Sequence, residues 1–251
     1  MRRHALAASL GAIALAGSGH LALAQTTGSI TADIIPLQDW QAETAVLDGW
    51  SADTLIDADV RDPSGDVIGN VENIIFGMNG EVLSVIAEIG GFWDIGDTHV
   101  SIPWSSVEVS PAGTGVVVPV TEDTVDDYTL FQDEVLTAFG AQRQIGEVSG
   151  GGFGEVETGP RAFRATEYLG DYVRLSGGDG MVNYGYIEDV VIKDGEIAAV
   201  MVRPDVGWGA TGTYAYPYYG TRSGWSPASP YYDLPYTRQE IERLEPVDNI
   251  G

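Results

Sequence analysis

The sequence contains two similar copies of one unit, and this repeat constrains the fold more than any single motif does. Residues 68–75 read IGNVENII, and residues 184–191 read YGYIEDVV. Each segment runs into a turn sequence, Asn-Gly-Glu at 79–81 and Asp-Gly-Glu at 194–196, and an apolar run follows both turns. A duplication of this length indicates two related domains within one chain.

The first copy has the pattern of an antiparallel sheet. Strands are expected at 58–61, 67–78 and 81–89, where β-branched and other apolar residues dominate. Asn79 and Gly80 lie between the last two and predict a type I′ hairpin turn, in which both central residues have positive φ. The segment 81–89 is too apolar for a sheet with one wet face, which favours a small barrel.

The second copy repeats this plan, with strands expected at 171–175, 184–193 and 196–203. Many short strands with little helix between them predict an all-β chain that forms two small β-barrels in tandem. Short helical segments, a linker and an irregular tail complete the expected fold. Ser51, Thr166 and Thr237 each precede a segment suited to a short helix, whose first turn a hydroxyl can cap.

The N-terminus has the features of a secretory signal peptide. Arg2 and Arg3 form a basic start, an apolar stretch follows at 5–16, and Ala-Leu-Ala at 22–24 is a small-x-small cleavage signal before Gln25. We therefore expect a periplasmic or extracellular protein, with no membrane insertion after cleavage. The chain has no cysteine, so it uses no disulfide in that compartment.

These features divide the chain into five expected segments. They are a signal peptide at 1–24, an N-terminal extension at 25–47, a first barrel domain at 48–130, an acidic and glycine-rich linker with a short helix at 131–160, and a second barrel domain with a Tyr/Pro/Gly-rich tail at 161–251.

The charge balance excludes some classes of partner. The chain has 37 acidic and 12 basic residues, a net charge of −25; removing Arg2 and Arg3 with the leader leaves 10 basic residues, or −27. Such a surface repels phosphate backbones and anionic lipid, so nucleic acid is not an expected partner. The acidity fits either solubility in a saline habitat or attraction of cations.

Several segments of the first copy resemble the PRC-barrel family. They are WSADTLIDADV at 50–60, GDVIGNVEN at 65–73, GEV at 80–82, GGFWDIGD at 90–97 and VSIPW at 100–104.

The resemblance covers 48–128 closely and 161–219 more loosely, because RPDVGW at 203–208 replaces the usual glycine pair. The family takes its name from the cytoplasmic part of the photosynthetic reaction centre H subunit. The resemblance implies a compact β-barrel used for assembly and protein contacts. It implies no general active site, so no catalytic residue or cofactor is carried over.

Two polar groups of residues were candidates for chemistry. His99 is the only histidine outside the leader, and no nucleophile-elbow motif accompanies it or Ser101, so we expect no enzyme. The second group is a set of aspartates around the first turn, which either satisfy their own turn backbones or bind calcium. They are Asp57, Asp59, Asp62 and Asp66.

The last candidate is a set of aromatic residues towards the C-terminus. They either close the second barrel or face a partner, because exposed aromatic rings suit protein and sugar contacts. The candidates for partner binding are Trp208, Tyr214, Tyr216, Tyr218, Trp225, Tyr231 and Tyr232.

Together these observations predict a secreted, non-enzymatic contact or assembly module at the cell envelope. Its expected partner is another envelope protein. The alternative is an envelope module that binds a glycan or calcium. The sequence leaves the oligomeric state open.

Overall fold

A computed structural model describes most of the two repeats. The described residues are 34–90, 98–111, 113–121, 124–125, 162–220, 224–225 and 229–247. All of them belong to one compact unit that spans Thr31–Gly251. The expected signal peptide at 1–24 and the expected linker helix in 131–160 lie outside the described residues.

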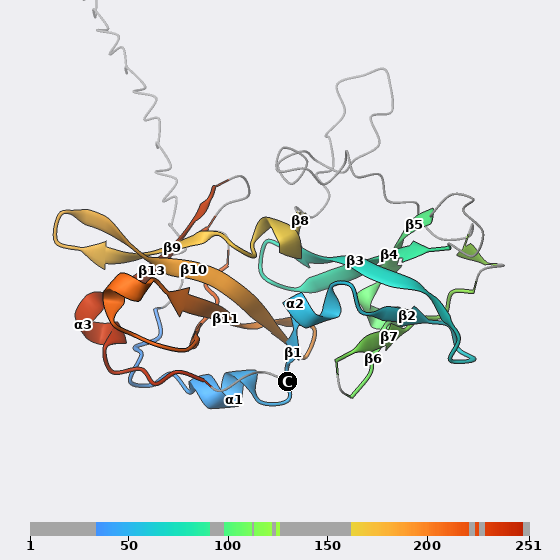
Figure 1. The fold of residues 1–251 in the computed structure, drawn as a ribbon, viewed down its shortest axis with the longest axis horizontal. Helices are drawn as coiled ribbons and strands as arrows, with labels where there is room; N and C mark the ends of the chain where they lie inside the picture. The colour runs from blue at the N-terminus through green and yellow to red at the C-terminus, as the bar shows by residue number, and fades with distance from the viewer. Residues whose placement is uncertain are drawn as a thin grey trace, which may run out of the picture. The chain divides into compact units, whose positions relative to one another are not determined.

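The all-β prediction is confirmed, because two curled sheets contain most of the regular secondary structure among the described residues (Figure 1). The first sheet has the order β5 (Thr98–Pro103), β4 (Val82–Ile89), β3 (Val67–Gly77), β2 (Asp59–Arg61), β7 (Gly115–Val117) and β6 (Glu108–Val109). The second has the order β12 (Tyr214–Tyr216), β11 (Glu196–Pro204), β10 (Gly180–Lys193), β9 (Tyr172–Gly177) and β13 (Tyr231–Thr237).

The helices are short. They are α1 (Ala42–Val46), α2 (Ala52–Leu55) and α3 (Arg238–Ile241), with 3-10 turns η1 (Trp104–Ser106), η4 (Ala165–Glu167) and η5 (Val206–Trp208). The longest helix in the described part of the chain, α1, has 5 residues, and none of the described helices could traverse a bilayer.

The two sheets follow the same plan strand for strand. The long hairpins β3–β4 and β10–β11 pair in the same register, with Asn70 opposite Glu88 and Tyr186 opposite Arg203. A bulge interrupts both hairpins at the equivalent place. Parallel pairing also recurs, between β2 and β7 and between β9 and β13. The sequence repeat is therefore a structural repeat.

Each repeat gives its leading strand to the other sheet. β1 (Trp50–Ser51) pairs with β10, where Ser51 lies opposite Val191, and β8 (Ala162–Arg164) pairs with β3, where Arg164 lies opposite Ile75 (Figure 1). Val191 and Ile75 are equivalent positions in the two repeats. The exchange is therefore reciprocal and symmetric, which the sequence division at residue 161 did not anticipate.

The two hairpin turns meet each other. The backbone N–H of Val82 donates to the carbonyl of Gly195 at 2.8 Å, and that of Ile197 donates to the carbonyl of Gly80 at 2.9 Å. The second turn has positive φ at both Asp194 and Gly195, as a type I′ turn requires. In the first turn only Gly80 does, so the type I′ prediction for that hairpin is wrong.

Two of the three expected helix caps are confirmed. Ser51 accepts a hydrogen bond from the backbone N–H of Thr54 at 2.9 Å, and Thr237 forms a capping box with Glu240. Thr166 lies inside the 3-10 turn η4 instead of before it, so that prediction is wrong.

One continuous core joins the repeats. It includes buried side chains from both sheets, such as Phe76 and Ile102 from the first and Tyr216 and Leu234 from the second. Phe163 of β8 is fully buried within it. Because the core crosses the boundary between repeats, each sheet depends on the other for the burial of its apolar face.

Candidate functional site

Most of the aromatic residues that the sequence singled out lie inside the protein. Tyr214, Tyr216, Trp225 and Tyr232 are at most 9% exposed. Tyr216 also shares a hydrogen bond of 2.8 Å with the hydroxyl of Tyr184, within the core. The prediction that these residues contact a partner is therefore corrected, because they pack in the core. The alternative is right that the tyrosines of 214–218 pack against the core, but β12 is an edge strand of the second sheet and does not close a barrel.

Both faces of β12 are covered, which explains why its three residues are buried. Tyr214 and Tyr216 point to the core, and Ala215 between them is also buried, because α1 and Trp40 just before it cover this side of the strand. The indole N–H of Trp40 donates to the carbonyl of Ala215 at 2.9 Å. The strand therefore has no wet face, although its alternating sequence suggests one.

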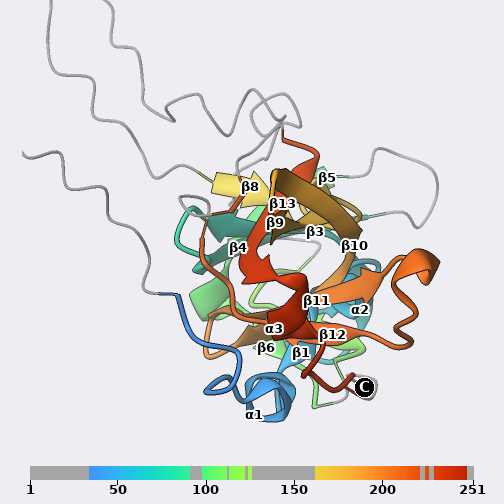
Figure 2. The same cartoon turned by 90° about the vertical axis from the view of Figure 1, so that its left-hand side faces the viewer.

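A row of exposed tyrosines crosses the outer face of the second sheet. Tyr231 of β13, Tyr172 of β9 and Tyr186 of β10 are direct register partners, and these three strands lie side by side in both views (Figures 1 and 2). Their exposed fractions are 38%, 52% and 37%. We call these three residues the tyrosine row. Of the three, only Tyr231 is among the partner-binding residues predicted from the sequence.

Arginines border the tyrosine row and are already paired. Arg174 donates to both carboxylate oxygens of Asp233, at 2.6 and 2.9 Å, and its guanidinium carbon lies 4.1 Å from the centre of the Tyr231 ring. Arg203, the register partner of Tyr186, forms an ion pair with Glu188. The row is therefore a nearly neutral aromatic surface on a strongly acidic protein, with Tyr231 held in place by Arg174.

The first repeat provides an internal comparison for this surface. The positions equivalent to Tyr172, Tyr186 and Tyr231 are Asp59, Asn70 and Gly115, as the shared registers show. The first repeat therefore adopts the same fold with small or polar residues there. Folding of this plan does not require three tyrosines at this place.

His99 and Ser101 are engaged with different partners. The imidazole Nε2 of His99 lies 3.3 Å from a carboxylate oxygen of Glu72. The hydroxyl of Ser101 donates to that of Ser84 at 3.0 Å. Neither arrangement is that of a base directed at a nucleophile.

Two of the four aspartates, Asp62 and Asp66, make side-chain contacts within the first turn. Asp62 accepts hydrogen bonds from the Ser64 hydroxyl at 2.6 Å and from the backbone N–H groups of Ser64 and Asp66. These bonds, that of the Ser64 hydroxyl above all, lower the pKa of Asp62. Asp59 forms an ion pair with Arg61, and Asp57 is an exposed residue with φ of 67°. Within the described ranges, no three histidine or acidic side chains gather as metal ligands.

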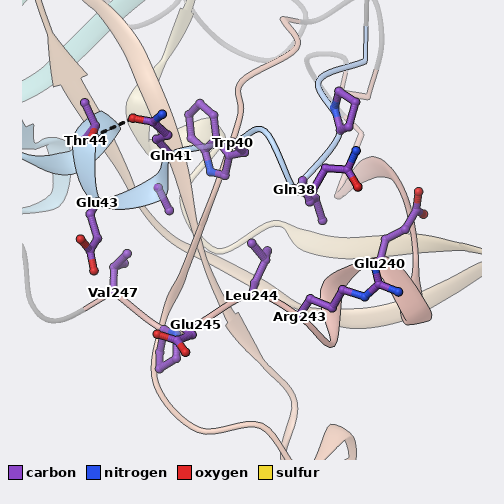
Figure 3. Close-up of a pocket in the computed structure, with 14 residues that line it drawn as sticks. Gln38, Trp40, Gln41, Glu43, Thr44, Glu240, Arg243, Leu244, Glu245 and Val247 are labelled. Carbon is purple, nitrogen blue, oxygen red and sulfur yellow. Dashed lines mark hydrogen bonds between the residues drawn. The ribbon is translucent and has the colours of Figure 1, made fainter.

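A cavity of about 730 Å³ lies between the segment that leads into α1 and the C-terminal segment after α3 (Figure 3). Trp40 and Leu244 contribute apolar walls, while Glu43 lies apart from Glu240 and Arg243. The charged side chains do not converge on one point, so the cavity has no defined polar recognition and we assign no ligand to it.

Asp189 is a half-buried carboxylate at the strand exchange. It accepts hydrogen bonds from the backbone N–H groups of Asp53 at 3.0 Å and Val190 at 2.7 Å, and it also bonds the Ser51 hydroxyl. Burial raises the pKa of Asp189 to about 6, although these hydrogen bonds oppose the shift. A perturbed carboxylate often marks a functional site, but here its bonds fasten α2 to the second sheet.

The equivalent residue in the first repeat is the amide Asn73. It accepts from the backbone N–H groups of Ile74 and Thr166, and its amide donates to the Thr166 hydroxyl at 2.8 Å. An amide can therefore accept the two equivalent backbone bonds without carrying charge, although it donates to its hydroxyl partner where Asp189 accepts from Ser51.

We expect Asp189→Asn to reduce the dependence of stability on pH. The native carboxyl keeps its proton up to about pH 6, whereas the unfolded one loses it near pH 3.8, so the native state binds more protons between these values. The free energy of unfolding should therefore fall as pH rises from 4 to 6, and the substitution should remove about 2–3 kcal/mol of that fall. Burial also raises the pKa of Asp171 to about 6, so the part of the pH dependence that comes from Asp171 should remain in the variant.

Urea denaturation at pH 4, 5, 6 and 7 measures this effect. The reciprocal substitution Asn73→Asp is the matched control, and it should add a fall of the same sign. Parallel pH profiles for the wild type and Asp189→Asn would contradict the prediction.

Comparison with protein families finds one match, in the first repeat. The model of the PRC-barrel domain matches residues 48–125. This span contains all six principal strands of the first sheet but not β8, and it does not reach the second repeat. A search of curated proteins found no match.

Proposed function

Since residues 48–125 match the model of the PRC-barrel domain, we propose that the chain is a non-enzymatic contact module that binds a protein partner at the cell envelope. The tyrosine row carries this proposal. Tyrosine is enriched in protein interfaces because its ring buries a large area while its hydroxyl remains able to form hydrogen bonds. The equivalent positions of the first repeat have no aromatic residue, because Asp59, Asn70 and Gly115 lie there. The aromatic row is therefore specific to the second repeat.

The charge of the chain limits the kinds of partner surface that fit the proposal. With a net charge of −25, the protein repels nucleic acid and anionic lipid at long range. The paired arginines beside the row offer no free cation to offset that repulsion. A partner surface that is apolar or basic is the best complement.

The envelope location rests on the N-terminal sequence. The basic start, the apolar stretch at 5–16 and the cleavage signal at 22–24 support export by a signal peptide. Export would place the mature chain in a periplasm or outside the cell, where the partner would be found.

Replacing Tyr172 and Tyr231 together by serine is expected to weaken partner binding by at least thirtyfold. Central interface tyrosines each contribute on the order of 1–2 kcal/mol or more. The row is exposed, so the thermal unfolding midpoint should change little. Retention of envelope proteins on the immobilised wild type and variant, quantified by mass spectrometry, measures the loss.

The matched control is Asp59→Ser with Asn70→Ser, which changes the equivalent row of the first repeat. Retention should survive in this control. Equal retention by the wild type, the tyrosine variant and this control would contradict the tyrosine row as the binding surface.

A glycan is the second candidate partner, because the rings of Tyr172 and Tyr231 lie 6.4 Å apart on an exposed face and aromatic faces also pack against sugars. Protease treatment of the envelope extract separates the two candidates. Binding that survives proteolysis and disappears with the tyrosine variant would favour the glycan.

A further inference from the structure

A second, smaller cavity lies in the second repeat and shares no residue with the tyrosine row. Its volume is about 170 Å³. At roughly 30 Å³ for each water, it would hold a ligand of about six non-hydrogen atoms. It is lined by Tyr184, Trp208, Gly209, Ala210, Tyr214, Arg238, Ile241, Glu242 and Leu244.

The walls of this cavity are aromatic and fixed in position. The rings of Tyr184 and Trp208 meet edge to face, with centres 5.1 Å apart and planes at 89°. The hydroxyl of Tyr184 is bonded to that of Tyr216, and the indole N–H of Trp208 donates to the carbonyl of Asn183 at 3.1 Å. These bonds satisfy the polar groups of both side chains, so the rings contribute only aromatic surface to the cavity wall.

In this structure the Trp208 ring already has a cation next to it, the guanidinium of Arg238. The guanidinium carbon of Arg238 lies 4.7 Å from the centre of the Trp208 ring, and its Nε donates to a carboxylate oxygen of Glu242 at 3.2 Å. The side chains of Arg238 and Glu242 are 63% and 61% exposed. Because both side chains are largely solvated, the ion pair is weak and Arg238 can leave Trp208 at little cost.

We propose that this cavity binds a small quaternary ammonium cation, with Arg238 as the internal group that it displaces. A cation over a tryptophan face is attracted by the ring quadrupole, and aromatic cages recognise quaternary ammonium in this way. Glu242, once released from Arg238, supplies the opposite charge at the rim. The acidity of the whole chain raises the local concentration of cations around the site.

Ligand-observed NMR titration of the full chain with choline tests the proposal, using the choline methyl signal. The neutral isostere 3,3-dimethyl-1-butanol is titrated in parallel. We expect choline to bind at least tenfold more tightly than this alcohol, because the alcohol fills the same space without the charge.

Three variants sharpen the test. Trp208→Leu should reduce choline affinity at least tenfold, whereas Trp104→Leu, at a half-buried tryptophan of the first repeat, should leave it unchanged. Arg238→Gln removes the competing cation and should raise choline affinity about fivefold. This third result keeps the proposal testable even where Trp208→Leu impairs folding.

Equal affinities for choline and the alcohol would overturn the proposal, since the cavity would then be only an apolar hollow. Absence of choline binding in both the wild type and Arg238→Gln would overturn it as well. Neither result bears on the tyrosine row, so the proposed function stands or falls separately.

Discussion

Replacing Phe163 by alanine is expected to lower the free energy of unfolding by about 3–5 kcal/mol, the usual cost of a buried ring. Phe163 is fully buried on the exchanged strand β8. Its ring centre lies 5.6 Å from that of Phe76 in the first repeat and 4.8 Å from that of Trp225 in the second. The substitution should therefore destabilise both repeats in one cooperative transition.

Urea denaturation followed by tryptophan fluorescence and by far-UV circular dichroism measures this effect. Tyr172→Ala is the control, because it removes a ring of similar size that is 52% exposed, and it should cost less than about 1 kcal/mol. Two separate transitions in the Phe163→Ala protein, one near the wild-type midpoint, would show that the repeats fold independently.

Cutting the chain between Gly150 and Gly151 is expected to leave the two fragments bound to each other. The first fragment would retain β1 but lose β8, and the second would retain β8 but lose β1. Each fragment alone lacks a strand of its own sheet and exposes its half of the shared core. We therefore expect neither fragment to fold when it is expressed alone, and the mixture to recover the native fold.

Circular dichroism of the separate fragments and gel filtration of the cleaved protein provide the measurement. A mixture of the two fragments at increasing concentration should regain cooperative unfolding, because association stabilises the folded form by mass action. One fragment that unfolds cooperatively on its own would contradict the exchange as the basis of stability.

The sequence was sufficient to predict the repeated strands but not their exchange. The long hairpins β3–β4 and β10–β11 follow from β-branched runs around turn sequences, which are local signals. The exchanged strands have only 2 and 3 residues. Trp50 is near its own repeat in sequence but pairs with Ile192, so its pairing depends on tertiary packing and not on a local pattern.

The aromatic residues show a second limit of prediction from sequence, since burial also depends on tertiary packing. A cluster of tyrosines near the C-terminus suggested a surface, whereas packing against the core buries Tyr216 and Tyr232 completely. The exposed Tyr172 and Tyr186 come from strands of another part of the sequence. Alternation with the buried Val173 and Ile187 marks both tyrosines as outward-facing, so this signal was present in the sequence.

Site-specific photo-cross-linking tests most directly whether the tyrosine row is the contact surface. A photo-reactive phenylalanine analogue is placed at Tyr172 in one protein and at the equivalent Asp59 in another, and both are irradiated in intact cells. We predict a discrete, protease-sensitive adduct from position 172 and none from position 59. The same adducts from both positions, or no adduct from position 172, would contradict a protein contact through this face.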